Sequence, residues 1–112
     1  MRSKDGRAAT IRLRFSESAR IGPGKIALLE GVGRSGSLER AGAALGMSGR
    51  RAALLVESVN EIFDTPVVEP ADDGGDRLTA LGEALVAAFR ETEQALDRVV
   101  AERFAELRKR MR

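Results

Sequence analysis

The chain has 112 residues, enough for one domain, and 43% of them are apolar, which is ordinary for a folded protein. It contains no cysteine and no histidine, and no nucleophile has a base beside it, so we expect no enzyme, no metal site and no cofactor. Residues 1 to 51 hold 11 Lys or Arg and 4 Asp or Glu, whereas residues 52 to 112 hold 8 Lys or Arg and 13 Asp or Glu. The basic first half indicates either a polyanionic partner or a solvated basic face.

The beginning of the chain predicts a short tail, a strand and a helix. Residues 1–9 are charged and no apolar segment follows them, so we expect a flexible N-terminus and not a secretory signal. No apolar run reaches the roughly 18 residues of a membrane span, which predicts a cytoplasmic protein with no membrane partner. Residues 10–16 (TIRLRFS) alternate apolar and basic side chains, as in a strand with one buried and one basic face. Pro23 suits the start of a helix that ends around residues 33–36.

Two helices joined by a tight turn are expected next. Ser37 is suited to cap a short helix over residues 38–45, and Gly46 can supply the positive φ that ends it. Ser48 is suited to cap the following helix, over residues 49–63, whose apolar residues recur at intervals of three and four. Small residues suit the point where the two helices cross, and the chain offers Ala41, Gly42 and Ala44 there.

This pattern is typical of a helix-turn-helix, whose second helix enters the major groove of DNA with its first turn. Arginine is the side chain best matched to the exposed edge of guanine. We therefore predict a recognition helix over residues 48–63. Its predicted base-reading residues are Ser48, Gly49, Arg50 and Arg51. The alternative is a plain helical hairpin whose arginines are only solvated.

Two short strands, at residues 67–70 and 77–78, flank a glycine-containing loop and predict a wing, which the early strand would complete as one small sheet. The expected fold is therefore mainly α with a small β-sheet, a winged helix-turn-helix over residues 10–79. Position in that fold predicts five phosphate contacts, each of which is alternatively a solvated side chain. They are Lys25, Arg34, Ser37, Arg40 and Arg77.

The last predicted segment covers residues 80–112. It is expected to form a long helix from residue 80 to residue 111, which Thr79 caps. At about 48 Å it is too long to be covered by its own domain, so its apolar stripe predicts a homodimer. The predicted interface residues are Leu85, Phe89, Leu96, Val100, Phe104 and Leu107. The alternative is that the last ten to fifteen residues fray in solvent.

Several motifs carry a resemblance to a known family: GPGKIALLEGVGRSGSLERAGAALGMSGRRA, LVESVNEIF, VVE and RLTALGEAL. They resemble the N-terminal DNA-binding domain of the molybdate-responsive (ModE-type) transcriptional regulators, within the winged-helix group shared with LysR-type regulators, over about residues 10–90. The resemblance implies a dimeric regulator that binds double-stranded DNA. A molybdate-binding module commonly follows this domain in the family, but nothing after the long helix here could form one. We therefore expect no molybdate site in this chain.

The sequence departs from the family pattern in the predicted recognition helix and in the wing, and Ala80 replaces the proline that is common after the capping Thr79. Gly49 and Ala53 stand where the family commonly has aromatic residues, and the wing carries Asp72, Asp73 and Asp76 where the family's wing is basic. The first hypothesis is a sequence-specific DNA-binding transcriptional regulator. The alternative, which these departures favour, is a dimeric interaction protein that keeps the winged-helix fold without binding DNA.

Overall fold

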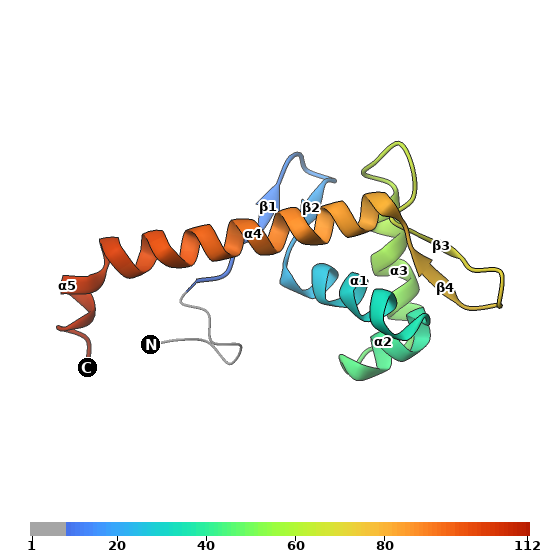
Figure 1. The fold of residues 1–112 in the computed structure, drawn as a ribbon, viewed down its shortest axis with the longest axis horizontal. Coiled ribbons are helices and arrows are strands. Elements are labelled where there is room, and N and C mark those ends of the chain that lie inside the picture. Colours follow the sequence, from blue (N-terminus) through green and yellow to red (C-terminus); the bar gives the residue numbers. More distant parts are fainter. Residues whose placement is uncertain (1–8) are drawn as a thin grey trace.

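The computed structural model of the protein describes residues 9–112, so the predicted flexible segment 1–9 lies almost entirely outside the described residues. The described chain is mainly helical with two small antiparallel sheets, as predicted at that level (Figure 1). Its elements are β1 (Leu13–Arg14), β2 (Arg20–Ile21), α1 (Pro23–Ser35), α2 (Leu38–Ala44), α3 (Gly49–Asn60), β3 (Val68–Pro70), β4 (Asp76–Leu78), α4 (Ala80–Arg103) and α5 (Ala105–Arg108). None of the helices in residues 9–112 has both the length and the hydrophobicity that crossing a bilayer requires.

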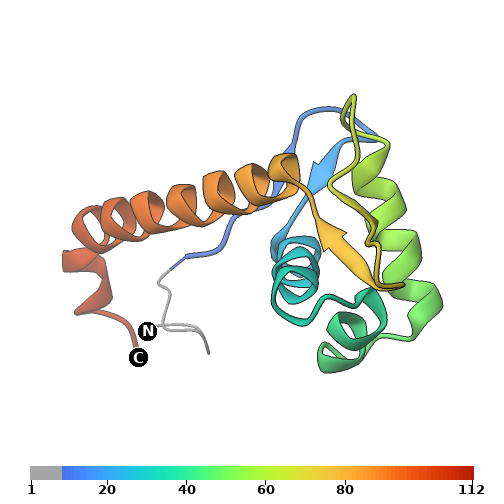
Figure 2. The ribbon, with the colours of Figure 1, turned by 45° about the vertical axis from the view of Figure 1, so that its right-hand side comes forward.

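Helix α1 is the centre of the core. Pro23 starts it, and Gly36, at φ 71°, ends it by donating its N–H to the carbonyl of Val32 at 2.9 Å. Helices α2, α3 and α4 all contact α1, so they pack around it (Figure 2). The buried side chains of α1 are Ile26, Leu28, Leu29 and Val32.

Serine hydroxyls set the starts of α2 and α3, as predicted. The Oγ of Ser37 accepts the N–H of Arg40 at 3.1 Å, and the Oγ of Ser48 accepts the N–H of Arg51 at the same distance. Gly46 adopts φ 76° in the turn between the helices, a left-handed conformation that most other residues rarely adopt.

The crossing of α2 and α3 depends on small residues. A Cβ on Gly42 would lie 2.8 Å from the Cβ of Ala52, so the helices approach too closely for any side chain there. Its neighbour Ala41 is buried against α1, where an added Cβ on Gly31 would lie 2.8 Å from the Cβ of Ala41. Ala44 is exposed, so its predicted place in the crossing is wrong.

The strands pair differently from the prediction. The early strand is confined to β1 and pairs with β2, with Leu13 opposite Ile21, while β3 and β4 form a separate sheet. The single sheet expected from residues 10–16 and the wing is therefore wrong. The physical reason is local: the chain reverses right after β1, where Phe15 donates its N–H to the carbonyl of Ala19 at 2.9 Å, so β1 finds its partner within a few residues.

The hairpin β3–β4 is bound to the start of α2. The N–H of Asp76 donates to the carbonyl of Gly36 at 2.9 Å, and the Oδ2 of Asp76 accepts the N–H of Leu38 at 2.8 Å. This acidic residue therefore satisfies one of the open N–H groups of a helix N-terminus.

The first half of α4 belongs to the core. Thr79 caps the helix by accepting the N–H of Gly82 at 3.1 Å, and Phe89 is 1% exposed. Phe89 therefore packs inside its own chain, and its predicted place in a dimer interface is wrong. At the next residue, the guanidinium of Arg90 donates to both carboxylate oxygens of Glu30 on α1, at 2.6 and 3.0 Å, and to buried Glu93 at 2.7 Å.

The second half of α4 extends away from the body, and the molecule measures 53 × 27 × 22 Å (Figure 1). The helix predicted to continue to residue 111 breaks at Phe104, whose φ of −106° and ψ of 8° separate α4 from α5. No glycine or proline lies near this break, and nothing in the structure explains it. Four large apolar side chains of this end are between 48% and 59% exposed: Val99, Phe104, Leu107 and Met111.

Candidate anion-binding site

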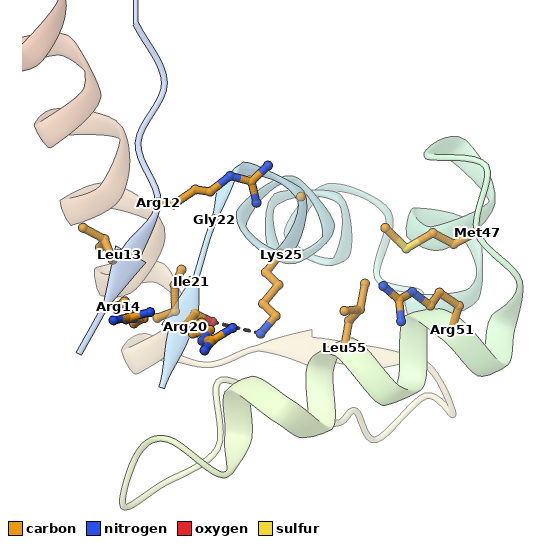
Figure 3. A pocket seen from close by; sticks show the side chains of 11 residues that line it. Arg12, Leu13, Arg14, Arg20, Ile21, Gly22, Lys25, Met47, Arg51 and Leu55 are labelled. Atoms are coloured by element: carbon orange, nitrogen blue, oxygen red, sulfur yellow. Dashed lines mark hydrogen bonds between the residues drawn. The ribbon is translucent and has the colours of Figure 1, made fainter. Parts of the chain in front are cut away.

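A pocket of about 470 Å³ lies between the hairpin β1–β2, the start of α1 and one face of α3 (Figure 3). The hairpin lies on one side and α3 on the other, with the first turn of α1 between them. The lining residues are Arg12, Leu13, Arg14, Arg20, Ile21, Gly22, Gly24, Lys25, Met47, Arg51 and Leu55.

Five of these residues are cationic, and none is an aspartate or glutamate. Of the five, Arg20 forms an ion pair: its Nη2 lies 3.1 Å from the Oε2 of Glu17 on the same hairpin. Both side chains are largely exposed. The other four cations form no ion pair within residues 9–112. Like charges close together repel one another, so this arrangement favours a bound anion.

The N-terminus of α1 adds backbone donors to the pocket. Gly22 precedes the helix, no side chain of residues 9–112 caps it, and its first turn has no acidic residue. The first N–H groups of an α-helix have no partner inside the helix, and they favour negative charge. Gly24 and Lys25 belong to this first turn and line the pocket.

Lys25 and Arg12 are both placed by contacts around the start of α1. The Nζ of Lys25 donates to the backbone carbonyl of Arg20 at 2.9 Å, which links α1 to β2 (Figure 3). Arg12 lies against Gly22, where an added Cβ would lie 3.6 Å from the Cγ and the Nη1 of the arginine. The Arg12 side chain therefore lies beside the helix N-terminus, as Figure 3 shows.

The opposite wall comes from α3 and the turn before it. Arg51 and Leu55 are four residues apart and share one face of the helix, and Met47 lies next to Arg51 (Figure 3). Ile21, which is fully buried, adds an apolar side chain from the hairpin. The pocket therefore combines cationic groups with an apolar wall.

The structure does not bring the predicted base-reading residues together in one site. Arg51 lines the pocket, but Arg50 and Gly49 do not and are exposed. The hydroxyl of Ser48 already accepts a hydrogen bond as the cap of α3.

The predicted phosphate contacts are also dispersed. Lys25 lines the basic pocket, whereas Arg34 is exposed in the last turn of α1. Ser37 and Arg40 line a second, polar hollow of about 570 Å³ between α2 and the tip of β3–β4. That hollow also contains the carboxylates of Glu39 and Asp73, so its charge is mixed.

Arg77 differs most clearly from its predicted role. Its guanidinium donates to the carboxylate of Glu69 on the paired strand β3, and this hydrogen bond raises the pKa of Arg77. Arg77 therefore stays charged but is paired with an acid, on a hairpin whose tip carries Asp72 and Asp73. A nucleic-acid phosphate would meet carboxylates at this tip.

Sequence reasoning missed three of the five cations of the pocket: Arg12, Arg14 and Arg20. The signal was present in the alternation of residues 10–16, which predicted a basic face. The reversal of the chain at residues 15–19 was not predicted, and this reversal brings Arg20 back beside Arg14, its partner in the hairpin register.

Comparison with known proteins finds two relatives that are named for binding molybdenum-pterin. No protein-family model matches it. The chain is 33% identical over 96 residues to the molybdenum-pterin-binding protein MopA of Rhodobacter capsulatus, covering 82% of this chain and 36% of the relative. It is 34% identical over 101 residues to the molybdenum-pterin-binding protein MopB of the same organism, covering 87% of this chain and 37% of the relative. The chain thus spans little more than a third of the length of these relatives.

These relatives correct the functional prediction. Both are named for binding molybdenum-pterin, and neither name describes a DNA-binding regulator or a reaction. The prediction of a transcriptional regulator that binds double-stranded DNA and has no molybdate site is therefore contradicted, and with it the alternative of a plain interaction protein. The molybdenum connection of the family resemblance agrees with both relatives.

Proposed function

We propose that this chain binds a molybdenum oxyanion, and that the pocket between β1–β2, α1 and α3 is the site. The observation that carries the proposal is that five cationic side chains, and no aspartate or glutamate, line one pocket that includes an uncapped helix N-terminus. Molybdate is a tetrahedral dianion whose oxygens accept hydrogen bonds. Guanidinium, ammonium and helix N-terminal N–H groups are the donors that suit such an ion.

The donors present suit an oxyanion better than a metal cation. Within residues 9–112, no group of three or more acidic side chains could hold a metal ion. Lys25 would contribute a point charge above β2, and Arg51 a planar pair of donors from α3. Arg12 would add charge at the helix N-terminus. The two relatives support this assignment through the molybdenum in their names.

Calorimetric titration of the purified chain with sodium molybdate tests the proposal. We expect saturable binding that Lys25→Gln and Arg51→Gln each weaken by roughly 10-fold or more, because each removes a hydrogen bond to a charged group. Arg50→Gln is the matched control, since Arg50 is adjacent to Arg51 but lies outside the pocket. Absence of molybdate binding, or an equal loss in Arg50→Gln, would overturn the proposal.

We further propose that α1, α2, α3 and the hairpin β3–β4 form a winged helix-turn-helix, used here as the scaffold of the pocket. The short α2, the turn at Gly46, the capped α3 and the following hairpin support this assignment. The scaffold is relevant to the site because the turn between α2 and α3 contributes Met47 and positions the first turn of α3.

We also propose that the outer end of the chain, residues 99–111, pairs with a second copy. The radius of gyration is 16.0 Å, compared with about 13 Å for a compact chain of this length, because this end extends from the body. Its large apolar side chains are about half exposed, which favours a helical partner with an apolar stripe of the same kind. Leu96 and Val100 are partly buried on the same helix and would lie at the edge of this contact.

A further inference from the structure

The basic pocket is larger than a bare oxyanion requires. Its volume is about 470 Å³, whereas a tetrahedral oxyanion occupies the space of a few water molecules, each of which takes about 30 Å³ in the liquid. Pockets of roughly 300–1,000 Å³ are typical of sites for organic molecules. An oxyanion held by the cations would therefore leave most of the pocket unfilled.

The remaining space has a different chemical character. Met47 and Leu55 lie on either side of Arg51 along one wall, opposite Lys25 and Arg12 (Figure 3). Aliphatic side chains and a methionine sulfur make favourable contacts with the faces and edges of aromatic rings. Arg51 forms no ion pair within residues 9–112, so its planar guanidinium is available to stack on such a ring.

The backbone that carries Arg51 is fixed in place by its neighbours. The N–H of Arg51 is fixed by the hydroxyl of Ser48, and the first turn of α3 is anchored by buried Ala52 packed on Gly42. The wall of Met47, Arg51 and Leu55 is therefore part of a well-packed crossing of helices. Such a wall is pre-organised, which lowers the entropic cost of binding a rigid ring.

We infer that the pocket takes a planar heterocycle that carries an anionic group, with the ring on the wall of Met47, Arg51 and Leu55 and the anion at Lys25, Arg12 and the N-terminus of α1. This inference rests on the proposed function, because it assigns the cations to the anionic end of the ligand. It adds that the ring supplies part of the affinity. Bare molybdate would then occupy the anionic end alone.

Titration of the full chain with matched probes tests the inference. The probes are guanosine monophosphate (GMP), which carries both a planar heterocycle and a phosphate, guanosine, ribose 5-phosphate and molybdate. We expect GMP to bind roughly 10-fold or more tightly than either guanosine or ribose 5-phosphate, because stacking of one base adds to the anionic contact.

Two variants locate the ring. Leu55→Asn should lower the affinity for GMP to near that for ribose 5-phosphate, because it places a polar group where the ring would lie. Leu54→Asn is the matched control, because Leu54 is adjacent on α3 but 50% exposed and outside the pocket. Equal losses in the two variants would contradict the inference.

The results also separate this inference from the proposed function. If molybdate and ribose 5-phosphate bind and GMP binds no more tightly than ribose 5-phosphate, the ring site is wrong and the oxyanion site stands. If none of the anionic probes binds, both are wrong. The comparison of probes on the unaltered chain decides between these results even where Leu55→Asn fails to fold.

Discussion

Gly42 shows how one residue sets the distance between two helices. An added Cβ would lie 2.8 Å from the Cβ of Ala52, closer than such atoms approach in proteins. We expect Gly42→Ala to lower the free energy of unfolding by about 1–3 kcal/mol, the usual cost of overpacking a core. Gly49→Ala is the control, because nothing lies within 4 Å of its added Cβ. Urea unfolding measures both, and equal stability of the two variants would contradict the close crossing.

Arg90 joins α4 to α1 through Glu30 and lies beside buried Glu93 on its own helix. We expect Arg90→Met to lower the free energy of unfolding by about 3 kcal/mol, because it removes the cation from a largely buried ionic network. Arg98→Met, an exposed arginine of the same helix, should change it little. Urea unfolding of the two variants makes the comparison, and a small loss in Arg90→Met would show that the network contributes little.

The pH dependence of this network follows from the pKa of Arg90. That pKa is raised, above all by the hydrogen bond to Glu30, against the opposing effect of burial. A basic group whose pKa is higher in the folded than in the unfolded protein stabilises the fold. This stabilisation is fully present below the pKa of the unfolded state and is lost as pH rises through the pKa of the folded state. Because the pKa of Arg90 is raised, the contribution of its charge should be constant from neutral pH up to the strongly alkaline range in which a free arginine loses its proton.

At the scale of single residues, the sequence located the site only in part. Lys25 was predicted as a phosphate contact and Arg51 as a base-reading residue, both for DNA, because both lie at helix starts that local signals identify. Arg12, Arg14 and Arg20 were missed because their approach depends on a chain reversal between them. The apolar wall was read only as core, since a buried stripe on a helix gives no sign that a pocket opens beside it.

At the scale of elements, helices were predicted better than strands. The starts of α1, α2, α3 and α4 agree with the prediction because a proline or a capping hydroxyl marks each of them within one turn. The sheet was wrong because β1 pairs with β2 across residues 15–19, which contain no glycine or proline. Strand pairing depends on contacts beyond the strand itself, so its composition could not identify the partner.

The outer end of α4 gives a prediction at this scale. Removal of residues 104–112 should leave the free energy of unfolding nearly unchanged, because the buried residues of α4 end at Glu93. It should also convert a dimer to a monomer, and so should Leu107→Glu, whose side chain is 59% exposed. Gln94→Glu, at an exposed polar position on α4, is the control. Light scattering measures the mass, and a truncated chain that stays dimeric would contradict the proposed contact.

At the scale of the whole molecule, the charges are separated in space as well as in sequence. Five cations of the first half line the pocket where the hairpin β1–β2 faces α1 and α3, whereas the hairpin β3–β4 carries an acidic tip. Anion binding at a pocket this open should weaken as ionic strength rises, because salt screens exposed charges. We expect molybdate affinity to fall several-fold between about 10 mM and 150 mM sodium chloride, and an affinity independent of salt would argue against the cationic site.

The central claim is that the basic pocket serves a molybdenum oxyanion and not duplex DNA. The most direct test titrates one preparation of the protein, at low ionic strength, with molybdate and in parallel with a short DNA duplex. The account predicts saturable molybdate binding that Lys25→Gln and Arg51→Gln weaken, with no comparable binding of the duplex. Tight duplex binding that Arg50→Gln abolishes, without molybdate binding, would contradict the account and restore the DNA-binding prediction made from the sequence.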